Sequence, residues 1–130
     1  MTVGLGLGLL LIRLVFGLTF AAHGAQKLFG WFGGHGLAGT AGFMESLGLK
    51  PGRVQALLAG LGEVVAGLLF AIGLWIPLAS LLMVVIMLVA IVKVHGPKGY
   101  LSPGGYEYNL AIITVAVALA LTGPGRYVLF

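Results

Sequence analysis

Two ionisable side chains lie inside otherwise apolar stretches, and these are the residues most able to do chemistry. Arg13 interrupts the first apolar stretch, and Glu63 stands in the middle of the second. A charged side chain at the bilayer centre costs roughly 3 kcal/mol on insertion scales, so it normally faces protein or a cavity. Counted from His23 and Arg53, both residues lie about 15 Å from the same membrane surface. We therefore predict a buried ion pair between Arg13 and Glu63.

Helical periodicity places small residues beside these charges, which indicates faces that pack against other helices. The partners on the Glu63 face are Ala56, Ala59, Gly60, Ala66 and Gly67. Those on the Arg13 face are Gly17, Phe20, Gly24 and Lys27, and those on the Glu107 face are Ala111, Thr114 and Ala118. Two interpretations of the predicted pair stay open. It either fixes which helices pack together or forms part of a ligand or proton site.

A second polar group is expected where the apolar stretches end. Its members are His23 and Lys27, then Lys93 and His95, then Tyr106, Glu107, Tyr108 and Asn109. Together with Arg13 and Glu63 they predict a polar track from one membrane surface to the bilayer centre. Such a track suits the polar head of a lipophilic ligand such as a quinone, with His or Glu exchanging protons. An ordinary belt of Tyr, Lys and His at the lipid headgroups is the open alternative.

Several other chemistries find little support. The chain has no cysteine, which excludes thiolate catalysis and thiolate metal sites by this chain alone. His23 and His95 without further ligand spacing make a poor metal motif, so no metal is expected and haem is disfavoured. The glycine-rich run 29–36 lacks the strand and helix of a nucleotide loop. The scattered cations do not form the patch of a nucleic-acid-binding protein.

Composition and apolar runs predict an all-α, polytopic membrane protein with a bundle of four transmembrane helices. Hydrophobic residues make up 60% of the 130 residues, charged residues 8%, and the mean hydropathy is +1.15. The expected spans are roughly 4–22, 54–74, 77–94 and 107–121, against the about 20 residues that cross a bilayer. One domain, 1–130, is expected. An interfacial helix is predicted over 37–49, carrying Leu37, Phe43, Met44 and Leu47 and ended by Gly48 and Pro51.

The distribution of Lys and Arg predicts the orientation of the chain. The first and third connections share one side of the membrane and hold Lys27, Lys50, Arg53 and Lys98. The opposite side holds only Arg126. We therefore expect the first and third connections in the cytoplasm and both termini outside.

The chain resembles the DoxX family over nearly its whole length. The resemblance rests on Arg13, Gly17, His23-Gly24 and Lys27-Leu28-Phe29, on Gly42-Phe43, on 47–49 with Pro51, and on Glu63 with Gly67 and Gly73. It continues in 106–110 and in Gly123-Pro124-Gly125, and it departs from the family pattern at 128–130. The resemblance implies a four-helix protein of the bacterial plasma (inner) membrane. Relatives are associated with membrane redox systems, among them a thiosulfate–quinone oxidoreductase and a complex that links superoxide detoxification to thiol metabolism.

The leading hypothesis is a redox-associated accessory of the lipid bilayer that binds a quinone-like or other lipophilic ligand. Arg13 and Glu63 would set the buried polarity, and His23, Lys27, Lys93, His95, Glu107 and Asn109 would contact the ligand or relay protons. No self-contained catalytic motif is evident, so an enzymatic role would be that of a subunit beside redox partner proteins. The alternative is a non-enzymatic scaffold or subunit of a larger complex. Self-association is also left open.

Overall fold

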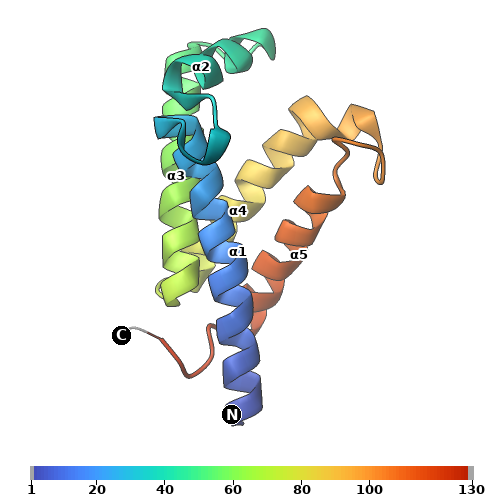
Figure 1. Cartoon of the computed structure of the whole chain (residues 1–130). Helices are drawn as coiled ribbons and strands as arrows, with labels where there is room; N and C mark the ends of the chain where they lie inside the picture. The colour runs from blue at the N-terminus through green and yellow to red at the C-terminus, as the bar shows by residue number, and fades with distance from the viewer. Residues whose placement is uncertain (1, 129–130) are drawn as a thin grey trace.

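Five α-helices, joined by turns and short helical segments, make up residues 2–128, which the computed structural model describes (Figure 1). They are α1 (Val3–Phe29), α2 (Gly36–Ser46), α3 (Gly52–Ile72), α4 (Ile76–Ala90) and α5 (Glu107–Thr122). A 3-10 turn, η1 (Trp31–Gly33), follows α1. The π-helical η2 (Ile91–His95) and the 3-10 turn η3 (Gly96–Lys98) extend α4. Glycines in the left-handed conformation end two of the long helices, Gly30 after α1 and Gly73 after α3.

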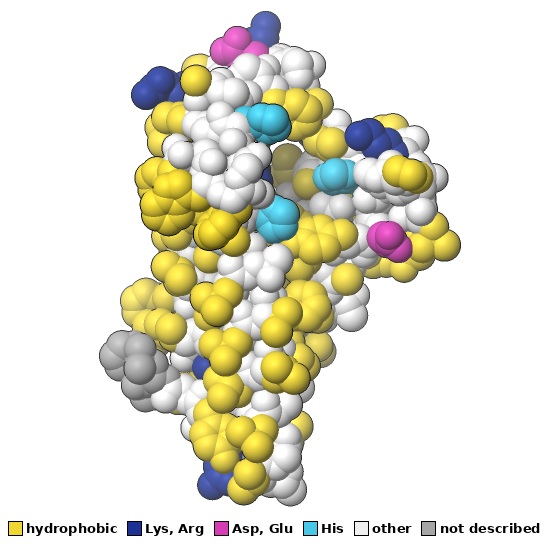
Figure 2. All heavy atoms as spheres, viewed as in Figure 1, with side chains coloured by type: hydrophobic (Ala, Val, Ile, Leu, Met, Phe, Trp, Pro, Cys, Tyr) yellow, Lys and Arg dark blue, Asp and Glu magenta, His cyan; other side chains and the backbone are white. Residues whose placement is uncertain are grey.

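The helices have the length and the surface of a membrane protein. Three segments are long and apolar enough to cross a bilayer, namely Val3–Phe29, Gly52–Ile72 and Ile76–Lys98. The fourth apolar helix, α5, has 16 residues, or about 24 Å of helix against a hydrocarbon layer of about 30 Å. Large apolar side chains cover the outside, including Leu11, Leu58 and Leu81 (Figure 2). A soluble chain would bury these residues, whereas lipid accepts them.

Helices α1 and α3 pack closely because glycines face each other along the contact. A Cβ atom added at Gly17 would lie 2.6 Å from the carbonyl oxygen of Gly67, and one added at Gly24 would lie 2.6 Å from that of Gly60. Only glycine permits two backbones to come this near. The antiparallel register therefore places Gly17 beside Gly67 and Gly24 beside Gly60. The prediction that these faces turn toward protein is confirmed for α1 and α3.

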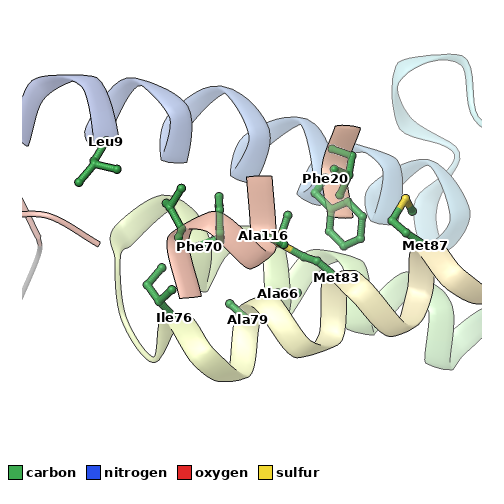
Figure 3. Close-up of a cluster of buried hydrophobic side chains, with 11 residues drawn as sticks. Leu9, Phe20, Ala66, Phe70, Ile76, Ala79, Met83, Met87 and Ala116 are labelled. Atoms are coloured by element: carbon green, nitrogen blue, oxygen red, sulfur yellow. The ribbon is translucent and has the colours of Figure 1, made fainter. Parts of the chain in front are cut away.

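A hydrophobic core joins α1 and α3 to the hairpin of α4 and α5 (Figure 3). Its largest fully buried apolar side chains are Phe20, Phe70, Met83 and Ile112. At the end of the molecule where α2 lies, the α4–α5 hairpin diverges from α1 and α3 (Figure 1). The start of α1 and the end of α5 lie at the other end. At the α2 end a cavity opens between the two pairs of helices.

The helix bounds differ from the sequence expectation chiefly in the first helix. The expected range ended at residue 22, but α1 continues through His23 and Lys27 to Phe29. The expected interfacial helix exists as α2, and α5 agrees with its range to within a residue. Helix α4 ends at Ala90, and its last expected residues form the π-helical η2. These shifts determine which charged residues meet.

Candidate functional site

The buried Arg13 does not pair with Glu63, and this prediction was wrong. Arg13 is 1% exposed, and within residues 2–128 its hydrogen bonds all go to backbone carbonyls. Its acceptors are Phe70 (3.3 Å) and Ala71 (2.9 Å) at the end of α3, and Pro124 (3.0 Å) and Tyr127 (2.6 Å) in the C-terminal segment. The last carbonyls of a helix lack partners within the helix and carry partial negative charge, so they suit a cation. Arg13 thus ties the C-terminal segment to the end of α3.

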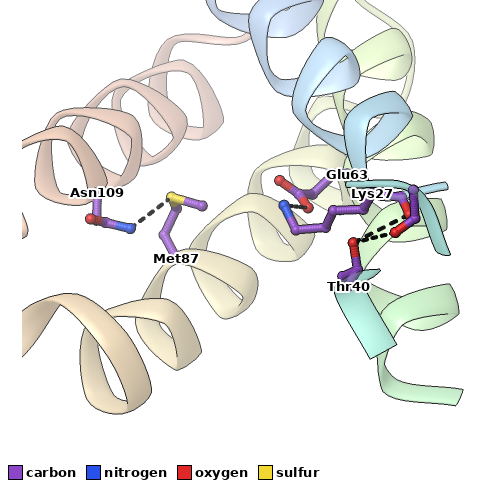
Figure 4. Close-up of polar contacts among 6 residues, drawn as sticks. Lys27, Thr40, Glu63, Met87 and Asn109 are labelled. Atoms are coloured by element: carbon purple, nitrogen blue, oxygen red, sulfur yellow. Dashed lines mark hydrogen bonds and ion pairs between the residues drawn. The ribbon is translucent and has the colours of Figure 1, made fainter. Parts of the chain in front are cut away.

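Glu63 instead forms an ion pair with Lys27, whose Nζ lies 2.5 Å from Glu63 Oε1 (Figure 4). Helical side chains lean toward the N-terminus of their own helix. In antiparallel helices Lys27 of α1 and Glu63 of α3 therefore lean toward each other. The Glu63 side chain is 3% exposed and that of Lys27 30% exposed. The pair is thus a buried carboxylate held by a cation that keeps partial access to its surroundings.

A cavity of about 610 Å³ opens beside this pair, between the two groups of helices. Figure 2 shows a hollow at the α2 end of the molecule, with histidine side chains around it. The wall is predominantly apolar, with Phe20 from α1, Phe43, Met44 and Leu47 from the α2 region, and residues 85–87 from α4. Cavities of this size and character are typical of small-molecule sites.

Polar side chains from five elements interrupt the apolar wall. They are His23 and Lys27 of α1, Thr40 of α2, Gln55 and Glu63 of α3, Lys93 and His95 of η2, and Tyr108 and Asn109 of α5. The His23 and Tyr108 rings are 5.7 Å apart between their centres, so this contact links α1 to α5. Seven of the ten residues expected in the polar track thus line one cavity. Arg13, Tyr106 and Glu107 do not: Arg13 lies toward the opposite end, and Glu107 is exposed on the outer face of α5.

The π-helical segment η2 brings Lys93 and His95 to the cavity. His95 Nδ1 lies 2.6 Å from the carbonyl oxygen of Gly104 in the following loop. A carbonyl oxygen only accepts, so Nδ1 carries the hydrogen. The Nε2 atom of the neutral ring is then a hydrogen-bond acceptor. Single π-turns occur often at functional sites, because the inserted residue redirects side chains.

Helix α2 forms a wall of the cavity, which sequence reasoning did not anticipate. Phe43, Met44 and Leu47 were predicted to rest on the membrane surface, yet they line the cavity. The Glu45 carboxylate accepts a hydrogen bond from the Gly52 amide (3.1 Å), which holds α2 against the start of α3. Thr40, Gln55 and Met87 were also missed as lining residues. Of these three residues, Gln55 was the one with a sequence signal, because its side chain is polar within an apolar stretch.

Comparison with known proteins agrees with the fold and with the motifs described above. The model of the DoxX family matches residues 8–96, which include most of α1 and all of α2, α3 and α4. This chain belongs to the DoxX family. The match includes Lys27, Glu63, Lys93 and His95 but ends before α5. The expected resemblance to DoxX proteins is thereby confirmed.

The chain is similar in sequence to a Bacillus subtilis (strain 168) protein called "Putative oxidoreductase CatD". It is 29% identical to this DoxX chain over 117 residues, which cover 90% of this chain and 80% of that protein. No solved structure gives a significant match. The chain is therefore a DoxX-family membrane protein with a distant relative named as an oxidoreductase.

Proposed function

We propose that this DoxX protein binds a lipophilic ligand with a quinone-type head in the cavity beside Lys27 and Glu63. The observation that carries the proposal is a predominantly apolar cavity whose buried wall contains an ion pair, in a protein coated with lipid-facing side chains. A hydrophobic tail suits the apolar wall and the surrounding lipid. A polar ring suits His23, Lys27, Lys93, His95 and Asn109, which supply both donors and acceptors.

The proposed role is that of a redox-associated accessory that presents this ligand to partner proteins in the membrane. The name of the Bacillus relative supports an oxidoreductase context. Any electron transfer would belong to the bound ligand and its partner, because the sequence has no cysteine. The scaffold alternative calls for small-residue faces directed at lipid. The glycines of α1 and α3 face each other instead, whereas the exposed Ala111, Thr114 and Ala118 of α5 form a small-residue face that would suit it.

The proposed topology has four spans, with α5 as the fourth, in the bacterial plasma membrane. Five cations belong to the α2 end and to the η2–η3 end of the molecule, namely Lys27, Lys50, Arg53, Lys93 and Lys98. The positive-inside rule then supports these connections as cytoplasmic and both termini as external. Reporter fusions at the C-terminus test the orientation, and a cytoplasmic reporter signal would contradict it.

Untargeted mass spectrometry of co-purifying lipids tests the ligand proposal. The chain is purified as wild type, as Glu63→Gln and as Glu107→Gln, the last being a matched control in which an exposed carboxylate is lost. We expect a prenylated quinone to be enriched over the bulk membrane in wild type and Glu107→Gln, and depleted in Glu63→Gln. Bulk phospholipid alone in monodisperse wild-type protein would overturn the proposal and favour the scaffold.

A further inference from the structure

The Asn109 side chain offers a buried acceptor at the cavity that lacks a donor. Asn109 lies near the start of α5, lines the cavity together with Tyr108, and is 2% exposed. Its Oδ1 atom has no hydrogen-bond partner among residues 2–128. A buried acceptor without a partner costs roughly 1–3 kcal/mol, so most such atoms are satisfied in native proteins. A ligand is one source of the missing donor.

The neighbouring Met87 determines which atom of the Asn109 amide lacks a hydrogen-bond partner. Asn109 Nδ2 lies 3.5 Å from Met87 Sδ (Figure 4). A thioether sulfur accepts hydrogen bonds but cannot donate them. Turning the amide around would set one acceptor against another. The oxygen is therefore the atom left without a partner, and only a donor can satisfy it.

Two further acceptors belong to the same cavity. The hydrogen bond from His95 Nδ1 to the Gly104 carbonyl leaves His95 Nε2 as an acceptor. The Glu63 carboxylate accepts only, and its Oε1 forms the ion pair with the Lys27 ammonium. Asn109, His95 and Glu63 come from three different elements, α5, η2 and α3. The polar part of the wall thus combines acceptors with the Lys27 and Lys93 ammonium donors.

This combination distinguishes the two redox forms of a quinone-type ring. A quinone head accepts hydrogen bonds through its carbonyls and donates none, so it satisfies Lys27 or Lys93 but leaves Asn109 Oδ1 unsatisfied. A hydroquinone or phenol both donates and accepts through its hydroxyls. We infer that the cavity selects the hydroxyl-bearing form, a lipophilic hydroquinone or phenol, over the corresponding quinone. The inference rests on the proposed function and concerns binding, not electron transfer.

Two probes with the same tail test the selectivity. Full-length protein in lipid nanodiscs is equilibrated anaerobically with 2-decyl-1,4-hydroquinone or with 2-decyl-1,4-benzoquinone, and protein-free nanodiscs correct for partitioning into lipid. We expect the hydroquinone to bind roughly five- to tenfold more tightly, since one satisfied buried acceptor is worth about this ratio. Equal affinity, or tighter binding of the quinone, would overturn the selectivity and leave the proposed function standing.

A pair of variants assigns the selectivity to Asn109. Asn109→Leu removes the acceptor at similar volume and should bring the affinity ratio close to one. Ser80→Ala is the matched control, because Ser80 is 3% exposed, its Oγ is also unpartnered within residues 2–128, and it does not line the cavity. An unchanged ratio in a folded Asn109→Leu protein would contradict the assignment. Failure of both probes to bind the wild type would overturn the proposed function as well.

Discussion

The Lys27–Glu63 pair predicts a strong asymmetry between the two single variants that break it. Lys27→Met leaves a carboxylate that is 3% exposed without its cation. Breaking a buried pair in this way is destabilising by about 3–5 kcal/mol. Glu63→Gln leaves an ammonium that is 30% exposed and can keep other polar contacts, so we expect a loss of about 1 kcal/mol, as for exposed pairs. Lys27→Met should therefore destabilise the protein by about 2–4 kcal/mol more than Glu63→Gln.

Thermal unfolding in detergent micelles, followed by circular dichroism, measures the difference. With about 4 °C of Tm per kcal/mol for a chain of this length, we expect losses of about 12–20 °C for Lys27→Met and about 4 °C for Glu63→Gln. The double variant should melt near Glu63→Gln, because removing the carboxylate also removes the unpaired charge. Lys98→Met, at an exposed loop lysine, should stay within about 0.5 kcal/mol of wild type.

Two results would refute this reasoning. One is a Lys27→Met protein that melts no lower than Glu63→Gln. The other is a double variant whose loss equals the sum of the two single losses. Either result would mean that the two side chains do not form a buried pair between α1 and α3.

Three further predictions concern the packing and the residues outside the cavity. Gly17→Ala should destabilise the chain by about 1–3 kcal/mol, because the added methyl group overlaps α3. Gly8→Ala should not, because nothing lies within 4 Å of its added Cβ. Equal Tm values for the two variants would contradict the close approach of α1 and α3. Arg13→Met should lower the Tm and expose the C-terminal segment to carboxypeptidase, unlike Arg126→Met, since Arg13 donates to the Pro124 and Tyr127 carbonyls. Equal digestion rates would contradict this. Glu107→Gln should change neither the Tm nor the affinity for decyl-hydroquinone, because its side chain is exposed on the outer face of α5.

The sequence identified the membrane fold and the packing faces because these follow from local patterns. Apolar runs and helical periodicity placed Gly17, Gly24, Gly60 and Gly67 on faces that meet protein, and the structure buries all four in the contact described above. The Glu107 face shows the limit of periodicity. Its neighbours Ala111, Thr114 and Ala118 are small, but that face of α5 points outward. Small residues permit a close contact without requiring one.

The wrong partner for Glu63 came from an error in helix length. The expected first span ended near His23, which put Arg13 about ten residues from the surface, at the depth of Glu63. Helix α1 continues to Phe29, so Arg13 lies deeper by several residues and meets the end of α3 at Ala71. Lys27 then falls inside the helix rather than in a loop. A charge at the end of an apolar run gives no sequence signal of whether the helix continues past it.

The cavity itself could be predicted only in part. His23, Lys27, Lys93, His95 and Asn109 were grouped because they end or begin apolar spans at one membrane level. Helix α2 was assigned to the membrane surface because its apolar residues suit an interface equally well. Its position over the cavity depends on tertiary contacts, including the Glu45 carboxylate with the Gly52 amide. Such long-range contacts have no local pattern in the sequence.

Photoaffinity labelling is the most direct test of ligand binding in the cavity. Protein in nanodiscs is irradiated with a decyl-benzoquinone that carries a diazirine at the head end of its tail, and the labelled peptides are mapped. Labels should fall on the segment with Phe43 and Met44 and on the segment with Met87, and excess unlabelled decyl-benzoquinone should suppress them. Labelling that spreads over lipid-facing positions such as Leu11 and Leu81, without competition, would contradict binding in the cavity.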